Sequence, residues 1–117
     1  MDQKDFREMT PLHYAASSGF PEIFSYLYYE AFEKCPVDRY GQTPMHLAAL
    51  QENPDLVEFL INLYGTVDYL DGEGNTPLHY STVNFKIFQI IYEQAQEKQP
   101  KNHKGQTPLV SKLDIDR

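Results

Sequence analysis

Polar and hydrophobic stretches alternate in short blocks along the chain, and residues 38–70 show the plan most clearly. The polar, glycine-containing stretch 38–42 predicts a turn. Thr43 then stands at a helix N-cap, and Pro44 takes the first helical position, where a backbone N–H is not needed. Small residues such as Ala48 would let a neighbouring helix approach the resulting short helix closely.

A second helix is predicted directly after the first. Asn53-Pro54 repeats the start signal, and apolar residues then follow at the i, i+3, i+4, i+7 spacing of one helix face. Gly65 is expected to end this helix. Neither helix is long enough to be stable alone in water, so the unit must bury its apolar stripe against a neighbour. The stripe consists of Leu56, Val57, Phe59, Leu60 and Leu63.

The start signal of the first helix recurs along the chain as one short phrase. Its copies are Thr10-Pro11-Leu12-His13, Thr43-Pro44-Met45-His46, Thr76-Pro77-Leu78-His79 and Thr107-Pro108-Leu109-Val110, and the intervals are 33, 33 and 31 residues. A phrase that returns at such a period indicates a repeat protein whose units are stable only when stacked.

These phrases and their flanking residues resemble ankyrin repeats. The matching stretches are 10–19, 38–49, 71–79 and 102–109, and the resemblance extends from residue 5 to about residue 113. It implies an all-α ankyrin-repeat solenoid, in which helix–turn–helix units are joined by β-turn or hairpin fingers. We expect one domain over residues 1–117, with repeats at about 5–37, 38–70 and 71–101 and a partial repeat at 102–117.

Departures from the family pattern predict local irregularities. Glu8 stands where the turn glycine is expected, so the first finger should be distorted. The third repeat is two residues short near 83–85, at the turn between its helices, and Ser81-Thr82 replace an alanine pair there. The last repeat has Val110 in place of the histidine and is expected to be a C-terminal cap or a cut end.

The charge is acidic and unevenly distributed. Ten basic and seventeen acidic residues give a net charge of −7, which argues against nucleic-acid or anionic-membrane binding. Residues 40–75 contain six acidic residues and no lysine or arginine. This stretch is either a solvated face or a surface that selects a partner protein with a basic segment.

The sequence also bears on the compartment. We find no secretory signal at the N-terminus and no apolar run of about 18 residues that a membrane span requires. The single cysteine, Cys35, excludes an internal disulfide framework, so the cytoplasm or nucleus is expected. Cys35 itself is predicted to be a weakly reactive, half-buried thiol.

Residues that could carry chemistry do not form a catalytic or metal-binding pattern. His13, His46 and His79 occupy one position in successive repeats, and the resemblance implies that each hydrogen-bonds between turn and helix. The carboxylates around Asp71 lack calcium-loop spacing, and the lone glycine pair there lacks the rest of a nucleotide loop. We therefore expect no enzyme activity, no cofactor and no metal.

Aromatic residues are abundant, with nine tyrosines and seven phenylalanines. Those in the second helices (Phe24, Tyr26, Phe59, Phe88 and Tyr92) are expected in the core. Phe6 and Tyr40 align with the tips of the turns, and an aromatic side chain there would suit a binding interface.

The resemblance implies a non-catalytic protein-binding module that contacts its partner through the concave face of the fingers and first helices. Mapped by position, the predicted contact residues are Phe6, Arg7, Met9, Ser17, Ser18, Arg39, Tyr40, Gln42, Leu50, Gln51, Glu73, Asn75, Val83, Asn84, His103 and Lys104.

Two alternative functions stay open. The chain could be a segment of a longer ankyrin array or a self-associating scaffold. The expected oligomeric state is a monomer or weak self-association through uncapped ends. It could also be a small inhibitor resembling the IκB group, which would mask a basic nuclear-targeting segment of a transcription factor.

Overall fold

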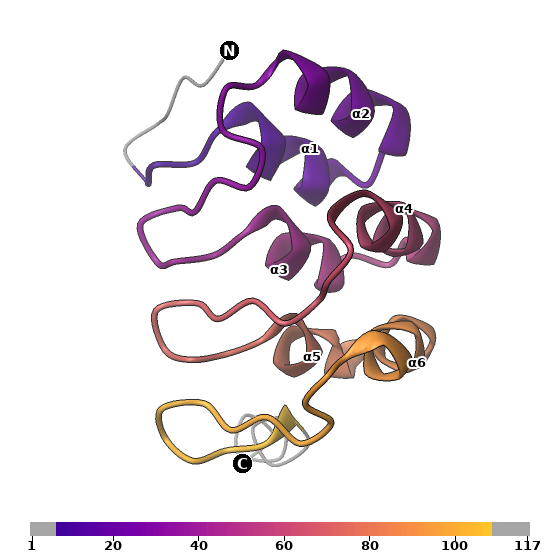
Figure 1. The fold of residues 1–117 in the computed structure, drawn as a ribbon. Coiled ribbons are helices and arrows are strands. Elements are labelled where there is room, and N and C mark those ends of the chain that lie inside the picture. The colour runs from indigo at the N-terminus through magenta and orange to yellow at the C-terminus, as the bar shows by residue number, and fades with distance from the viewer. Residues whose placement is uncertain (1–6, 109–117) are drawn as a thin grey trace.

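Residues 7–108 of the computed structural model are described, and helices are the regular elements among them. In order, these are α1 (Pro11–Ser18), α2 (Pro21–Glu30), α3 (Pro44–Ala49), α4 (Pro54–Tyr64), α5 (Pro77–Tyr80), the 3-10 helix η1 (Ser81–Val83) and α6 (Phe85–Gln94). The helices pack in two columns, α1, α3 and α5 in one and α2, α4 and α6 in the other (Figure 1). Loops project sideways from the first column. The predicted all-α solenoid is confirmed.

Each helix of the first column begins at the predicted threonine–proline pair. Thr10, Thr43 and Thr76 have extended backbones at the N-cap, and a proline follows each. The histidine at the third helical position returns a hydrogen bond to the cap, as in Thr43 N–H donating to His46 Nδ1 at 3.1 Å. The phrase therefore starts the helix through both its first and its last residue.

Helix α4 starts and ends as its sequence signals predict, and an asparagine also caps α6. Asn53 Oδ1 accepts from the backbone N–H groups of Asp55 and Leu56, and Asn84 Oδ1 accepts from that of Ile87. Gly65 ends α4 in the left-handed conformation, at φ 80°. By contrast, Phe20 at the start of α2 provides no side-chain cap.

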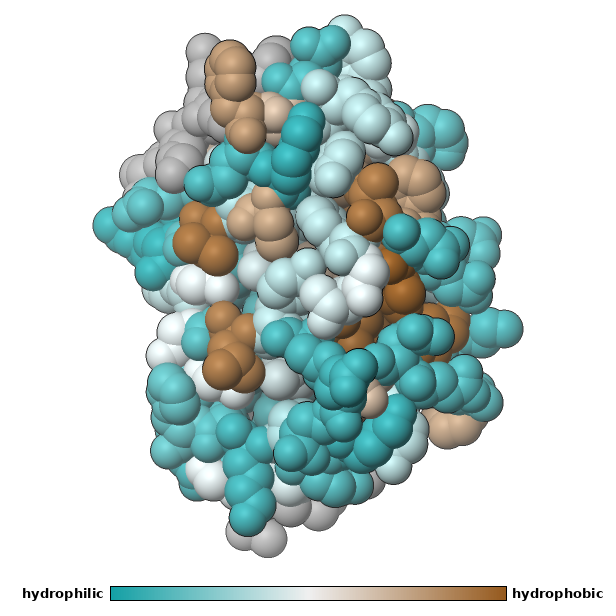
Figure 2. Space-filling view, in the orientation of Figure 1, coloured by the Kyte–Doolittle hydropathy of each residue, from teal (hydrophilic) through white to brown (hydrophobic). Residues whose placement is uncertain are grey.

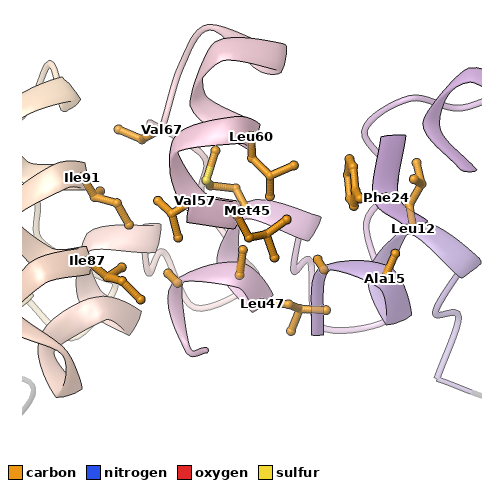
Figure 3. Packing of buried hydrophobic residues seen from close by; sticks show 14 of the residues in the cluster. Leu12, Ala15, Phe24, Met45, Leu47, Val57, Leu60, Val67, Ile87 and Ile91 are labelled. Carbon is orange, nitrogen blue, oxygen red and sulfur yellow. The ribbon is translucent and has the colours of Figure 1, made fainter. Parts of the chain in front are cut away.

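The hydrophobic core runs as one cluster through the stacked helix pairs. Figure 3 shows Phe24, Met45, Leu60 and Ile91 among the side chains that fill the space between successive layers. Each of these four residues is completely buried. The structure corrects one prediction here, because Tyr26 is 67% exposed and lies outside this core.

The predicted irregularity of the third repeat is confirmed. Helix α5 spans four residues and passes into η1, which reaches α6 through the single residue Asn84. Ser81, which stands where the second repeat has Ala48, is fully buried, and its hydroxyl donates to Leu78 O at 2.9 Å. Hydrogen bonding thus makes the buried serine tolerable in place of alanine.

Candidate interaction surface

Four loops each lead into one copy of the threonine–proline pair, and we call them fingers 1 to 4. They comprise residues 7–9 (as far as finger 1 is described), 38–42, 71–75 and 102–106. In the last three, one side chain organises the turn by accepting two backbone N–H bonds. Asp38 Oδ1 accepts from Tyr40 and Gln42, at 2.9 Å each. Asp71 and Asn102 do the same two and four residues ahead.

Backbone hydrogen bonds tie each finger to the next. Arg39 N–H donates to Arg7 O at 2.9 Å, and Gly72 N–H donates to Tyr40 O at 2.8 Å. His103 N–H completes the series by donating to Glu73 O at 2.9 Å. The fingers therefore form a connected row rather than four independent loops.

Glu8 adopts the left-handed backbone that glycine takes at the matching position of the other fingers. Its backbone takes φ 64°, close to the 79° of Gly41 and Gly74 at the matching position of the next two fingers. A side chain in this left-handed region costs about 1 kcal/mol relative to glycine. Position 8 therefore keeps the glycine-like backbone and carries strain, while the predicted distortion of the whole finger stays a prediction, because residues 5 and 6 lie outside the described residues.

The histidines have the structural role that the resemblance implies. Nε2 of His13, His46 and His79 lies 2.8, 2.8 and 2.9 Å from the carbonyl oxygens of Gln42, Asn75 and Gln106, each in the following finger. Since Nδ1 accepts from the cap N–H, Nε2 carries the proton and donates. Each ring thus fastens a helix start to the next finger.

Burial lowers the pKa of His46, against the opposing effects of the Asn75 carbonyl and nearby carboxylates. Burial also lowers the pKa of His79. Protonation of Nδ1 would set two donors against each other at the cap, so the neutral form is the one that fits. These histidines are committed to the fold.

Most of the predicted contact residues lie at the surface. Arg7, Ser18, Arg39, Tyr40, Leu50, Glu73, His103 and Lys104 are exposed, and Ser17, Gln42, Gln51, Asn75 and Asn84 are partly exposed. Met9 is a correction, because it is buried in the core and 8% exposed. Phe6 and the side chain of Val83 lie outside the described structure.

Three of the partly exposed amides already have partners, and Gln42 is one of them, because its Nε2 donates to the Tyr80 hydroxyl. Asn84 caps α6, and Asn75 Oδ1 accepts from Asn102 Nδ2 at 2.9 Å between fingers 3 and 4. Tyr40 and Leu50 are the large apolar members, 57% and 45% exposed. Figure 2 shows isolated hydrophobic residues among hydrophilic ones on the finger side, and a broader hydrophobic area over α4.

Tyr80 on α5 joins this surface, although the sequence did not single it out. Its hydroxyl donates to Asp71 Oδ2 and accepts from Gln42 Nε2 at 2.8 Å. The signal was its place directly after the repeated phrase, where the other repeats carry Tyr14 and Leu47. That position varies between repeats: Tyr14 also reaches a finger, accepting from Arg7 Nη2 at 3.3 Å, whereas Leu47 is buried in the core.

The described residues give no sign of a reactive thiol or a metal site. Burial raises the pKa of the half-buried Cys35 thiol, against a hydrogen bond with Tyr69 that lowers it. Between residues 7 and 108, no three His, Cys, Asp or Glu side chains gather closely enough to hold a metal ion. In the same span, no helix combines the length and apolar character that crossing a bilayer requires.

Comparison with known proteins agrees with this geometry. A family model of ankyrin repeats, in three copies, matches residues 1–71. A search of curated proteins found no match. The finger hydrogen bonds continue past the matched part, at 71–75 and 102–106. Ankyrin repeats are in general protein-interaction modules without catalytic activity. The match covers more than half of the sequence, and the chain belongs to the ankyrin repeat family.

Proposed function

We propose that this chain is a non-catalytic module that binds a partner protein through its finger surface. We define the finger surface as the exposed residues of fingers 1 to 4 together with Ser17, Ser18, Leu50 and Gln51. The observation that carries the proposal is the exposure of Tyr40 and Leu50 on backbone that neighbouring hydrogen bonds hold in place. Preorganised aromatic and aliphatic side chains lose little entropy on binding.

The decisive experiment replaces these two anchors together. Tyr40→Ala with Leu50→Ala should weaken binding at least tenfold, about 1.4 kcal/mol, without unfolding the chain. Partners are first captured from a lysate and identified by mass spectrometry, and their affinities are then measured by calorimetry. Tyr29→Ala on α2, at a side chain 71% exposed, is the matched control. Equal affinities of the double variant and the control would refute the finger surface as the binding site.

The acidic stretch 40–75 supports a partner with a basic segment. Asp55, Glu58 and Asp68 are exposed within it, as is Glu73. Association should then weaken as salt rises from about 50 to 500 mM, because salt screens exposed charges. The IκB-like hypothesis is the narrower form, in which that segment is a nuclear-targeting sequence. From the single cysteine, we also propose that the module acts in the cytoplasm or nucleus.

Self-association is a second candidate, favoured by one observation on α2. Ile23 and Tyr26 are 50% and 67% exposed, whereas Leu56 and Ile87, at the place of Ile23 in α4 and α6, are fully buried. This face of α2 suits a further repeat layer or a second copy of the chain. Light scattering over a concentration series tests the second copy, and a Tyr26→Glu variant should shift any dimer toward monomer.

A further inference from the structure

A cavity of about 400 Å³ lies between fingers 2 and 3, beside α5. Sites for small ligands span about 300–1,000 Å³, so this cavity is near the lower end. It would accept a single side chain of a partner. Both fingers and Tyr80 line it.

Two glycines allow fingers 2 and 3 to approach each other closely without filling the cavity. A Cβ atom on Gly72 would lie 2.9 Å from Tyr40 O, and one on Gly41 would lie 2.7 Å from Gly72 N. The Gly72–Tyr40 backbone hydrogen bond, at 2.8 Å, sets this approach. Because glycine has no side chain, neither residue fills the cavity.

The Tyr80 ring forms a fixed part of the lining. Asp71 accepts from its hydroxyl, Gln42 donates to it, and the His46 ring packs against it with centroids 4.9 Å apart. Burial, reinforced by the bond to Asp71, raises the pKa of Tyr80, so the hydroxyl stays protonated. Because its hydroxyl is hydrogen-bonded and its ring contacts His46, Tyr80 presents an aromatic surface that loses little further rotational freedom on binding.

Carboxylates give the cavity lining a net negative charge. Asp71 and Glu73 contribute two negative charges to the lining, against the positive charge of Arg39. Asp71 is already hydrogen-bonded by the turn and by Tyr80. The exposed Glu73 carboxylate has no hydrogen-bond or ion-pair partner within residues 7–108, so it can pair with a guest.

We propose that this cavity binds an arginine side chain of the partner protein. The guanidinium group stacks against the tyrosines at positions 40 and 80 and pairs with the Glu73 carboxylate. A planar guanidinium suits this combination better than lysine, since it stacks on aromatic rings and forms two parallel bonds to a carboxylate. The inference rests on the proposed function, because it names the side chain that the finger surface recognises.

The first experiment titrates the chain with N-acetyl-arginine methylamide and follows amide chemical shifts by NMR. The citrulline analogue, which keeps the shape and lacks the charge, is the matched probe. Shifts should gather at residues 39–42, 71–75 and 80 for arginine and be much smaller for citrulline. Glu73→Gln should weaken arginine binding about threefold, as for a partly exposed ion pair. Glu58→Gln, at an exposed carboxylate on α4, should change nothing.

Arg39→Gln supplies a test of sign. Removing a positive charge from the lining should tighten arginine binding, whereas an anionic guest would bind more weakly to this variant. The proposal is overturned if Arg39→Gln weakens binding and Glu73→Gln tightens it. It is equally overturned if arginine and citrulline bind alike.

A peptide selection separates this inference from the proposed function. Peptides from a random-sequence display library are selected for binding to the wild-type chain. Their binding to the Tyr40→Ala, Leu50→Ala variant is then measured. Selected peptides that lose binding to this variant and share an arginine support both statements. Peptides that lose binding but show no preference for arginine overturn the cavity assignment alone. Peptides that bind both proteins equally overturn the finger surface as well.

Discussion

The first and second repeats place equivalent residues in different surroundings. Leu56, the third residue of α4, is completely buried, whereas Ile23, the third residue of α2, is 50% exposed. Their sequences differ little in apolar pattern, so the difference comes from what lies beside each helix. Helix α4 has α2 on one side and α6 on the other, while the outer face of α2 has no described layer against it. In a stacked array, the burial of a residue depends on the neighbouring repeat as much as on the residue itself.

The largest expected effect tests this difference directly. Leu56→Ala should lower the free energy of unfolding by about 2–5 kcal/mol, because it leaves a cavity between layers. Ile23→Ala, at the same place in the first repeat, should cost about 1 kcal/mol or less. Urea denaturation followed by circular dichroism measures both. Similar losses for the two variants would mean that a further layer covers α2 in solution.

The second contrast concerns the fingers. Gly41→Ala should cost about 2 kcal/mol, since it adds left-handed strain and pushes a Cβ atom against Gly72 N, breaking the link to finger 3. Gly65→Ala is the control, because its φ is also near 80° but nothing lies within 4 Å of the added atom. Its cost should be about 1 kcal/mol. Thermal unfolding of the pair isolates the contact from the strain.

Acid should weaken the link between the second repeat and finger 3. Burial holds the pKa of His46 below its ordinary value of 6.5, so the unfolded chain binds the proton more readily than the folded one. Stability from this group is therefore complete above pH 6.5 and falls as the pH drops toward the folded pKa. Urea midpoints at pH 7.5 and 5.0 measure the loss. A His46→Gln variant should show a smaller difference between the two midpoints.

The smallest effect removes a difference between the first two fingers. Glu8→Gly should stabilise the chain by about 0.5–1 kcal/mol, because glycine adopts the left-handed backbone at position 8 without strain. Glu8→Ala keeps the strain and loses the carboxylate, and it should leave stability near that of the wild type. If the alanine variant gained as much as the glycine variant, charge rather than backbone strain would be the cause.

Local signals in the sequence were sufficient for the helix starts and the stacking plan. Thr43-Pro44 and Asn53-Pro54 act through bonds to their own helix, so they do not depend on distant parts of the chain. The shortened connection in the third repeat was predictable from its length, since that repeat is two residues shorter than the second. The repeat boundaries proposed from the sequence stay a prediction.

Features that depend on a neighbouring repeat could not be predicted from the sequence. Met9 was placed on the binding surface and Tyr26 in the core, and the structure reverses both. Alignment gives the position of a residue within its repeat but not whether another layer covers it. The lining by Tyr80 was missed because it joins residues 38 positions apart, as in its bond with Gln42.

The linked row of fingers also presents its side chains at a regular spacing. Stacked helices lie about 8–10 Å apart, and an extended polypeptide advances about 3.3 Å per residue. A partner segment lying along the row would move forward about three residues for each finger. Arg7, Tyr40, Glu73 and Lys104 occupy the same place in successive fingers. Side chains three apart in such a segment would meet a cation, an aromatic ring, an anion and a cation in turn, which is a short pattern that can be searched for in partner sequences.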